Sequence, residues 1–217
     1  MRLAIELNDV IRDYTSAFKT YYKKSVDPYF DIEDDNITSL EYDEVFPFKS
    51  ADDYMKFRFI DYPFELNGRA EAMGKMLPYK LTYWLQNALR DMDEEYVPDV
   101  LFVGMNESPL TIQATYFFLS KIQSRVRQVF FPTSYDELWD KCDMLITANP
   151  HLIENAPEGK IVIKIEAPYN KEIACKYSFK SLSDLIDDKN ETVIKILCGE
   201  EVEENKTENT ETETDGE

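Results

Sequence analysis

The sequence is poor in the residues that metal and disulfide frameworks require. It has three cysteines, Cys142, Cys175 and Cys198, and a single histidine among 217 residues. The cysteines are widely spaced, odd in number and form no Cys-x-x-Cys pair, so no zinc site is indicated. Two of them lie in apolar surroundings, which favours reduced, buried thiols in a cytosolic setting.

Long apolar runs and an excess of basic residues are also missing. No run reaches the roughly 18–20 apolar residues that a membrane span needs. The first residues lead directly into a strand pattern, without the basic start and cleavage site of a signal peptide. The 24 basic residues stand against 43 acidic ones, a formal net charge of −19. We therefore expect neither a membrane nor a sequence-specific nucleic acid among the partners.

Part of this acidity belongs to the C-terminal stretch, residues 200–217. The stretch holds nine acidic residues and one lysine, and it contains no aromatic residue. Its Glu/Thr/Asn repetition cannot bury enough apolar surface to order itself. The sequence thus predicts a single domain over residues 1–199, followed by a disordered acidic tail.

The regular part of the chain has the pattern of an α/β protein. A short apolar run over residues 3–7 predicts a buried strand, and apolar side chains three and four apart predict a helix after it. From residue 97 strands and helices alternate, which is typical of a doubly wound, mostly parallel sheet. The expected elements are strands at 99–105, 125–131, 144–146 and 161–165 and helices at 110–122 and 181–187, with 192–198 open between helix and strand.

Between the two core segments, 1–13 and 97–199, residues 14–96 are expected to form a helical cap insert. Helices are predicted over 51–59, 70–76 and 77–92, and a turn-rich segment over 62–68. The insert is dense in aromatic side chains, which either fill its core or form an interface, where aromatics are enriched. The candidate interaction residues are Phe46, Phe48, Phe59, Tyr62 and Phe64.

Three stretches of this frame point to a known family. Residues 3–13 read as a hydrophobic strand, a polar turn and a helix start. Residues 143–150, Asp-Met-Leu-Ile-Thr-Ala-Asn-Pro, lead into a Pro-Glu-Gly-Lys turn and another strand, and Ala-Pro-Tyr-Asn follows at 167–170. Together they resemble the haloacid dehalogenase (HAD)-like superfamily, in particular its 5′-nucleotidase-like branch. The resemblance implies a phosphatase cradle at the end of the first strand.

The catalytic positions of that family are not matched. Its first aspartate takes the phosphoryl group, and here that position holds Glu6. The extra methylene of glutamate displaces the carboxylate, and a misplacement of that size lowers the reaction rate about a hundredfold. Its second aspartate is the general acid/base, and here Asn8 cannot ionise. Its metal-binding pair falls on Thr147 and Ala148, which leaves only Glu6 for a Mg²⁺ ion that prefers charged oxygens.

Two further family groups are displaced as well. The hydroxyl that ends the second motif strand falls near Gly104 and Met105, and the phosphate-holding cation could be Lys160 or Arg127. We therefore expect a non-catalytic protein with no cofactor and no metal. Glu6 and Asn8 would then serve hydrogen bonding and helix capping at a strand end.

The degenerate frame is also similar to small proteins encoded beside the neck and tail genes of crAss-like bacteriophages. This implies a structural virion protein, such as a ring at the portal–tail junction, found in the virion or host cytoplasm. Its partners would be further copies of itself and portal or tail proteins. Two alternatives stay open: a Mg²⁺-dependent nucleotidase-like phosphohydrolase that uses Glu6, and a non-hydrolysing phosphate- or nucleotide-binding module that uses backbone amides after Asn8.

Overall fold

The structure is a computed structural model that describes residues 1–90, 92–105, 107–189, 191–200 and 202. The acidic tail expected over 200–217 lies almost wholly outside the described residues.

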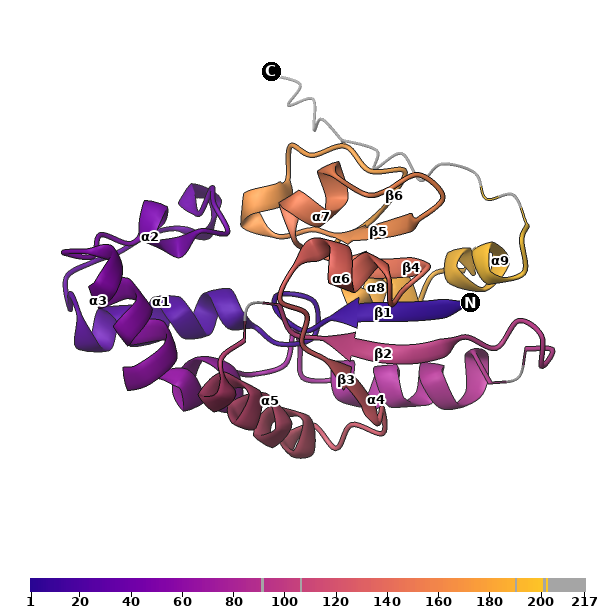
Figure 1. Cartoon of the computed structure of the whole chain (residues 1–217), viewed down its shortest axis with the longest axis horizontal. Coiled ribbons are helices and arrows are strands. Elements are labelled where there is room, and N and C mark those ends of the chain that lie inside the picture. The colour runs from indigo at the N-terminus through magenta and orange to yellow at the C-terminus, as the bar shows by residue number, and fades with distance from the viewer. Residues whose placement is uncertain (91, 106, 190, 201, 203–217) are drawn as a thin grey trace, which may run out of the picture.

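In this part of the chain six parallel strands form one sheet, in the order β3-β2-β1-β4-β5-β6 (Figure 1). The central strand β1 (Arg2–Glu6) pairs with β2 (Asp99–Val103) on one side and with β4 (Met144–Thr147) on the other. The α/β expectation is therefore confirmed. The outer strands are β3 (Gln128–Phe130), β5 (Ile161–Ile165) and β6 (Tyr177–Phe179).

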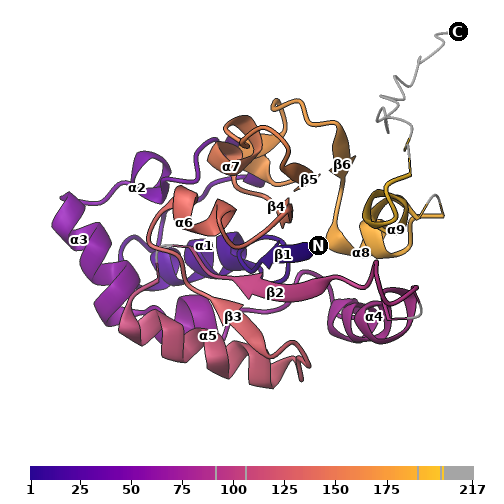
Figure 2. The ribbon, with the colours of Figure 1, turned by 45° about the vertical axis from the view of Figure 1, so that its right-hand side comes forward.

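Helices cover both faces of the sheet, as a parallel sheet with continuous apolar strands requires (Figures 1 and 2). Leu3 and Ile5 of β1 face one helical layer, and Ala4 faces the other. The first layer contains α4 (Leu77–Tyr83), α5 (Pro109–Lys121), α8 (Leu182–Ile186) and α9 (Thr192–Leu197), and the second contains α6 (Tyr135–Trp139) and α7 (Pro150–Glu154). The segment left open between helix and strand is thus the helix α9.

Helix ends follow the local sequence signals. Ser108 precedes α5 and accepts the backbone N–H of Thr111, with Pro109 at the first helical position. Ser134 accepts the N–H of Glu137 at the start of α6. These caps set where the helices begin, and hence where the loops at the carboxyl ends of β2 and β3 end.

The outer part of the insert, residues 14–68, lies beyond the carboxyl ends of β1 and β2, and we refer to it as the cap (Figure 1). Its core is aromatic: the ring of Phe18 stacks on Tyr42 at 4.6 Å and contacts Phe46 and Phe57 at 5.0 and 5.2 Å between centroids. Each such pair contributes roughly 0.5–1.5 kcal/mol beyond its burial. The cap elements are α1 (Tyr14–Ser25), η1 (Asp34–Asn36), α2 (Tyr42–Val45), α3 (Ala51–Lys56), η2 (Phe57–Asp61) and η3 (Phe64–Gly68).

The structure departs from the expectations at three places in the insert. The segment predicted as turn-rich is the π-helix η3, in which the Arg69 N–H bonds to the Phe64 carbonyl. The helix predicted over 70–76 is absent, because Ala72 instead forms a β-bridge with Arg12. Helix α4 and its continuation η4 (Trp84–Ala88) pack over β2 as part of the core layer, so residues 14–96 are not one cap.

Candidate functional site

The carboxyl ends of β1 and β4 bring the residues of the two motif stretches together. Ile5 pairs with Ile146, so Glu6 and Thr147 come next to each other at the strand ends. The Thr147 hydroxyl donates a hydrogen bond to the Glu6 carboxylate, and the backbone N–H groups of Ala148 and Asn149 also donate to it. The resemblance described above implied that Glu6 and Thr147 belong to one site, and the structure brings the two side chains into contact.

Glu6 is a carboxyl group held almost out of water, with 5% of the residue exposed. The pKa of its carboxyl group is raised from 4.5 to about 7, chiefly by burial and also by the nearby charge of Asp9, while the hydrogen bonds from Thr147 and the backbone act in the opposite direction. Near neutral pH the group is therefore a mixture of acid and carboxylate. One of its oxygens accepts the Thr147 hydroxyl at the end of β4.

Asp9 follows in a left-handed backbone conformation with φ of 56°, which aspartate tolerates better than most residues. Its Oδ1 accepts the Thr15 N–H at 2.9 Å. Its Oδ2 accepts the Thr15 hydroxyl at 2.8 Å, the Tyr169 hydroxyl at 2.7 Å and the Tyr42 hydroxyl at 3.3 Å. Both oxygens of this carboxylate are thus bound within the chain.

The two tyrosines come from opposite sides of the site. Tyr42 lies in α2 of the cap, and Tyr169 lies in η5 (Pro168–Asn170) of the core, so Asp9 joins the two parts. Burial raises the pKa of Asp9, and burial together with the charge of Asp9 holds the pKa of both tyrosines well above the usual value. Each hydroxyl therefore keeps its proton and acts as a donor.

Asn170 fixes the segment that carries Tyr169. Its Nδ2 donates to the carbonyls of Ala148 at 2.7 Å and Ile165 at 2.9 Å, and its Oδ1 accepts the Ala167 N–H at 2.9 Å. This amide closes the ends of β4 and β5, which gives the Ala-Pro-Tyr-Asn stretch a structural explanation.

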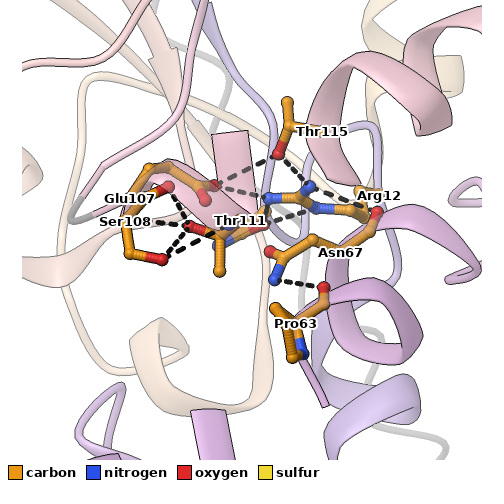
Figure 3. Close-up of polar contacts among 8 residues, drawn as sticks. Arg12, Pro63, Asn67, Glu107, Ser108, Thr111 and Thr115 are labelled. Atoms are coloured by element: carbon orange, nitrogen blue, oxygen red, sulfur yellow. Dashed lines mark hydrogen bonds and ion pairs between the residues drawn. The ribbon is translucent and has the colours of Figure 1, made fainter. Parts of the chain in front are cut away.

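Asn8 is bound by Arg12, a buried arginine that the sequence analysis missed. Figure 3 shows Arg12 with its partners Asn67, Glu107 and Thr115. Arg12 is fully buried, and its Nε and Nη2 both donate to Asn8 Oδ1, at 2.8 and 2.5 Å. Nη1 donates to Thr115 Oγ1 at 2.7 Å and to the Asn67 carbonyl at 3.3 Å, and Nη2 forms an ion pair with Glu107 Oε1 at 3.0 Å. The spacing of four residues between Asn8 and Arg12 was the available signal.

The place of the missing hydroxyl after β2 is filled. A Cβ at Gly104 would lie 3.0 Å from the ring of Phe131 and 3.1 Å from Cγ of Glu107. A larger residue there would require one of those two side chains to shift. The Ser108 hydroxyl, displaced into the next turn, is used as the cap of α5.

Neither cation proposed for phosphate binding lies at the site. Lys160 precedes β5, donates to the Cys142 carbonyl at 2.6 Å and lies 3.8 Å from Asp143, and Arg127 precedes β3. Both are at the amino ends of strands, opposite Glu6, so these assignments are wrong. The nearer cation is Lys164, paired in register with Thr147; it is buried and donates to the Ile173 carbonyl at 2.8 Å.

The candidate interaction residues divide by exposure. Phe46 is completely buried in the cap, and in this conformation it presents nothing to a partner. Phe48 and Tyr62 are half-buried and pack against Phe57 at 5.4 and 4.8 Å between ring centroids. Phe59 is also half-buried, beneath Arg58. Phe64 is 37% exposed and contacts Phe117 of α5, itself 49% exposed.

Within the described residues, no group of three or more His, Cys, Asp or Glu residues is placed to hold a metal ion. No helix in the same part of the chain is long and apolar enough to cross a membrane. The three cysteines are unpaired; Cys142 is buried, whereas Cys175 and Cys198 are half-buried.

Comparison with known proteins adds no family to this description. No protein-family model matches the chain, and no curated protein matches its sequence.

We predict that Arg12→Met lowers the free energy of unfolding by about 3–5 kcal/mol, because Glu107 is left buried without its partner. Adding Glu107→Leu should restore part of the loss, since the second substitution removes the stranded charge. Denaturant unfolding measures both. The control is Lys23→Met, which breaks the exposed pair with Asp31 and should cost at most about 1 kcal/mol. Equal losses of unfolding free energy in Arg12→Met and Lys23→Met would contradict a stabilising role of the buried ion pair.

We predict that Tyr42→Phe and Tyr169→Phe each lower the free energy of unfolding by about 1.5–3 kcal/mol, since each removes a donor to a buried carboxylate. Tyr29→Phe is the matched control in the cap, because Tyr29 is 93% exposed. Thermal and denaturant unfolding of the three variants test this, and a neutral effect at Tyr42 would contradict a bond between cap and core.

The raised pKa of Glu6 predicts a pH-dependent stability. The pKa of about 7 in the folded state exceeds the ordinary value of 4.5, so this contribution to stability is fully present below about pH 4.5 and is lost as the pH rises through 7. Relative to Glu6→Gln, the wild-type chain should lose roughly 3 kcal/mol between pH 5 and pH 8. Unfolding curves across this range measure the difference. Glu158→Gln at an exposed turn is the control, and parallel curves for wild type and Glu6→Gln would contradict the shift.

Proposed function

We propose that the chain is a non-catalytic HAD-like protein with a structural or assembly role, in which the former catalytic crevice holds the cap against the core. The observation that supports this proposal is that the polar side chains after β1 are already hydrogen-bonded to other residues of the chain. The amide oxygen of Asn8 accepts two bonds from Arg12. Asp9 accepts bonds from the cap at both oxygens and a bond from the core, through Tyr169, at Oδ2.

The HAD-like assignment is supported by three arrangements. The strand that carries the first motif lies in the centre of a parallel sheet, and the strand that carries the last motif is its neighbour. A helical insert begins directly after the first strand, as the cap of that family would. The residues that replace the catalytic groups of the family then lie at the expected crevice beyond the carboxyl ends of β1 and β4.

The same geometry argues against phosphoryl transfer. A nucleophile must approach phosphorus with a free oxygen, whereas Glu6 is bound by Thr147 and two backbone N–H groups. A general acid/base must exchange a proton with the leaving group, whereas Asn8 is an amide bound to a guanidinium.

A virion component, such as a ring at the portal–tail junction, is the particular role that we propose. It is supported by the resemblance of the degenerate frame to phage neck and tail-associated proteins. A head-to-tail interface that closes on itself gives such a ring from identical chains. Aromatic side chains exposed on the outside, such as Phe64 and Phe117, are of the kind that protein interfaces use.

The test is the assembly state of the pure chain, measured by native mass spectrometry and sedimentation, alone and mixed with portal and tail proteins. We expect a defined oligomer or a stable complex. A strictly monomeric chain, also in the presence of those proteins, would count against the assembly role.

A parallel assay separates the alternatives. With p-nitrophenyl phosphate and Mg²⁺ we expect no turnover above that of Glu6→Ala. Metal-dependent turnover that Glu6→Ala abolishes would instead assign a phosphohydrolase. Calorimetric heat on titration with nucleotides, without turnover, would assign a binding module.

A further inference from the structure

A groove lies between helix α4 and the segment that follows α5. Its first hollow encloses about 410 Å³ over Val100 and Phe102 of β2, with Leu81 and Leu85 on one wall. A second hollow of about 740 Å³ adjoins it and shares Pro78, Thr82, Ile122 and Arg125 with it. We call the two hollows together the basic groove.

The charge of the groove is opposite to that of the chain. The first hollow is lined by Arg125 and Arg127 and by no acidic residue. The second adds Lys75, Lys121 and one carboxylate, Glu71, which pairs with Lys121 at 2.9 Å. In a chain with 43 acidic and 24 basic residues, this is a local excess of cations that attracts an anionic segment.

Three of these cations have no carboxylate bound to them. Lys75, Arg125 and Arg127 are exposed, and among the described residues none of them forms an ion pair. Elsewhere in the same residues the exposed lysines Lys23, Lys56 and Lys171 do, as with Lys23 and Asp31 at 3.2 Å. The groove therefore has binding capacity for carboxylates that the described residues leave unused.

The described chain ends beside the helix that forms one wall of the groove. Helix α9 packs next to η4, where Ala88, Ile194 and Glu200 line a common hollow, and Val202 packs against the core (Figure 2). The wall formed by Leu81 and Leu85 is one turn earlier on the same continuous helix. The anchor of the tail and the groove thus belong to one part of the molecule.

The remaining residues, 203–217, have the matching charge and sufficient length. They contain seven acidic residues and one lysine, and fifteen residues reach up to roughly 50 Å when extended. A tethered segment also has a millimolar effective concentration at a nearby surface, so weak electrostatic attraction suffices for binding.

We propose that residues 203–217 bind in the basic groove of their own molecule, with their carboxylates on Arg125, Arg127 and Lys75. The tail then covers the cationic surface in the isolated protein. An acidic partner would have to displace the tail before it could bind there.

The test is zero-length carbodiimide cross-linking of the full chain at low concentration, followed by peptide mapping. We expect amide links from carboxylates of residues 203–217 to Lys75 in the monomer band. The links should fall by roughly fivefold or more in 0.5 M NaCl and in the double variant Arg125→Gln/Arg127→Gln, because both weaken an electrostatic contact.

The control double variant Lys49→Gln/Lys141→Gln removes the same charge from exposed positions outside the groove and should leave the links unchanged. Tail links to Lys49 as frequent as those to Lys75 would overturn the proposal. Links found only in a dimer band would also overturn it, in favour of a tail bound to a second copy.

Discussion

The guanidinium of Arg12 is the group on which the arrangement of cap and core depends. A buried arginine must place five N–H donors on acceptors, because an unpaired donor away from water is costly. The acceptors here come from the turn after β1, from η3 and from the start and body of α5. Three segments far apart in the sequence are thereby fixed to the end of the central strand.

The close approach of η3 to α5 follows from this constraint. The Asn67 carbonyl, in the π-helix η3, accepts a hydrogen bond from Arg12 at 3.3 Å. At Gly68 a Cβ would lie 3.2 Å from the Ala114 carbonyl, so a larger residue would push η3 away from α5. The aromatic rings of Tyr14 and Phe118 complete the enclosure, 5.9 and 5.7 Å from the guanidinium carbon.

The sequence predicted the parts of the structure that local patterns determine. Buried strands follow from apolar runs, whereas the meeting of Glu6 with Thr147 was implied only by the resemblance to a known family. The loop over 70–76 and the π-helix η3 could not be predicted, because their backbones are set by partners distant in the chain. The aromatic residues of the insert remained ambiguous for a related reason, since the same side chains suit a core and an interface.

The two edges of the sheet limit how copies of this chain can meet. Strands β3 and β6 are three residues long each, and they leave few unpaired backbone groups on which a further strand could grow. Association by strand addition would need a longer edge than either provides. Any assembly of this protein must therefore be specified by side chains on helices and loops, whose chemistry can differ between neighbouring faces.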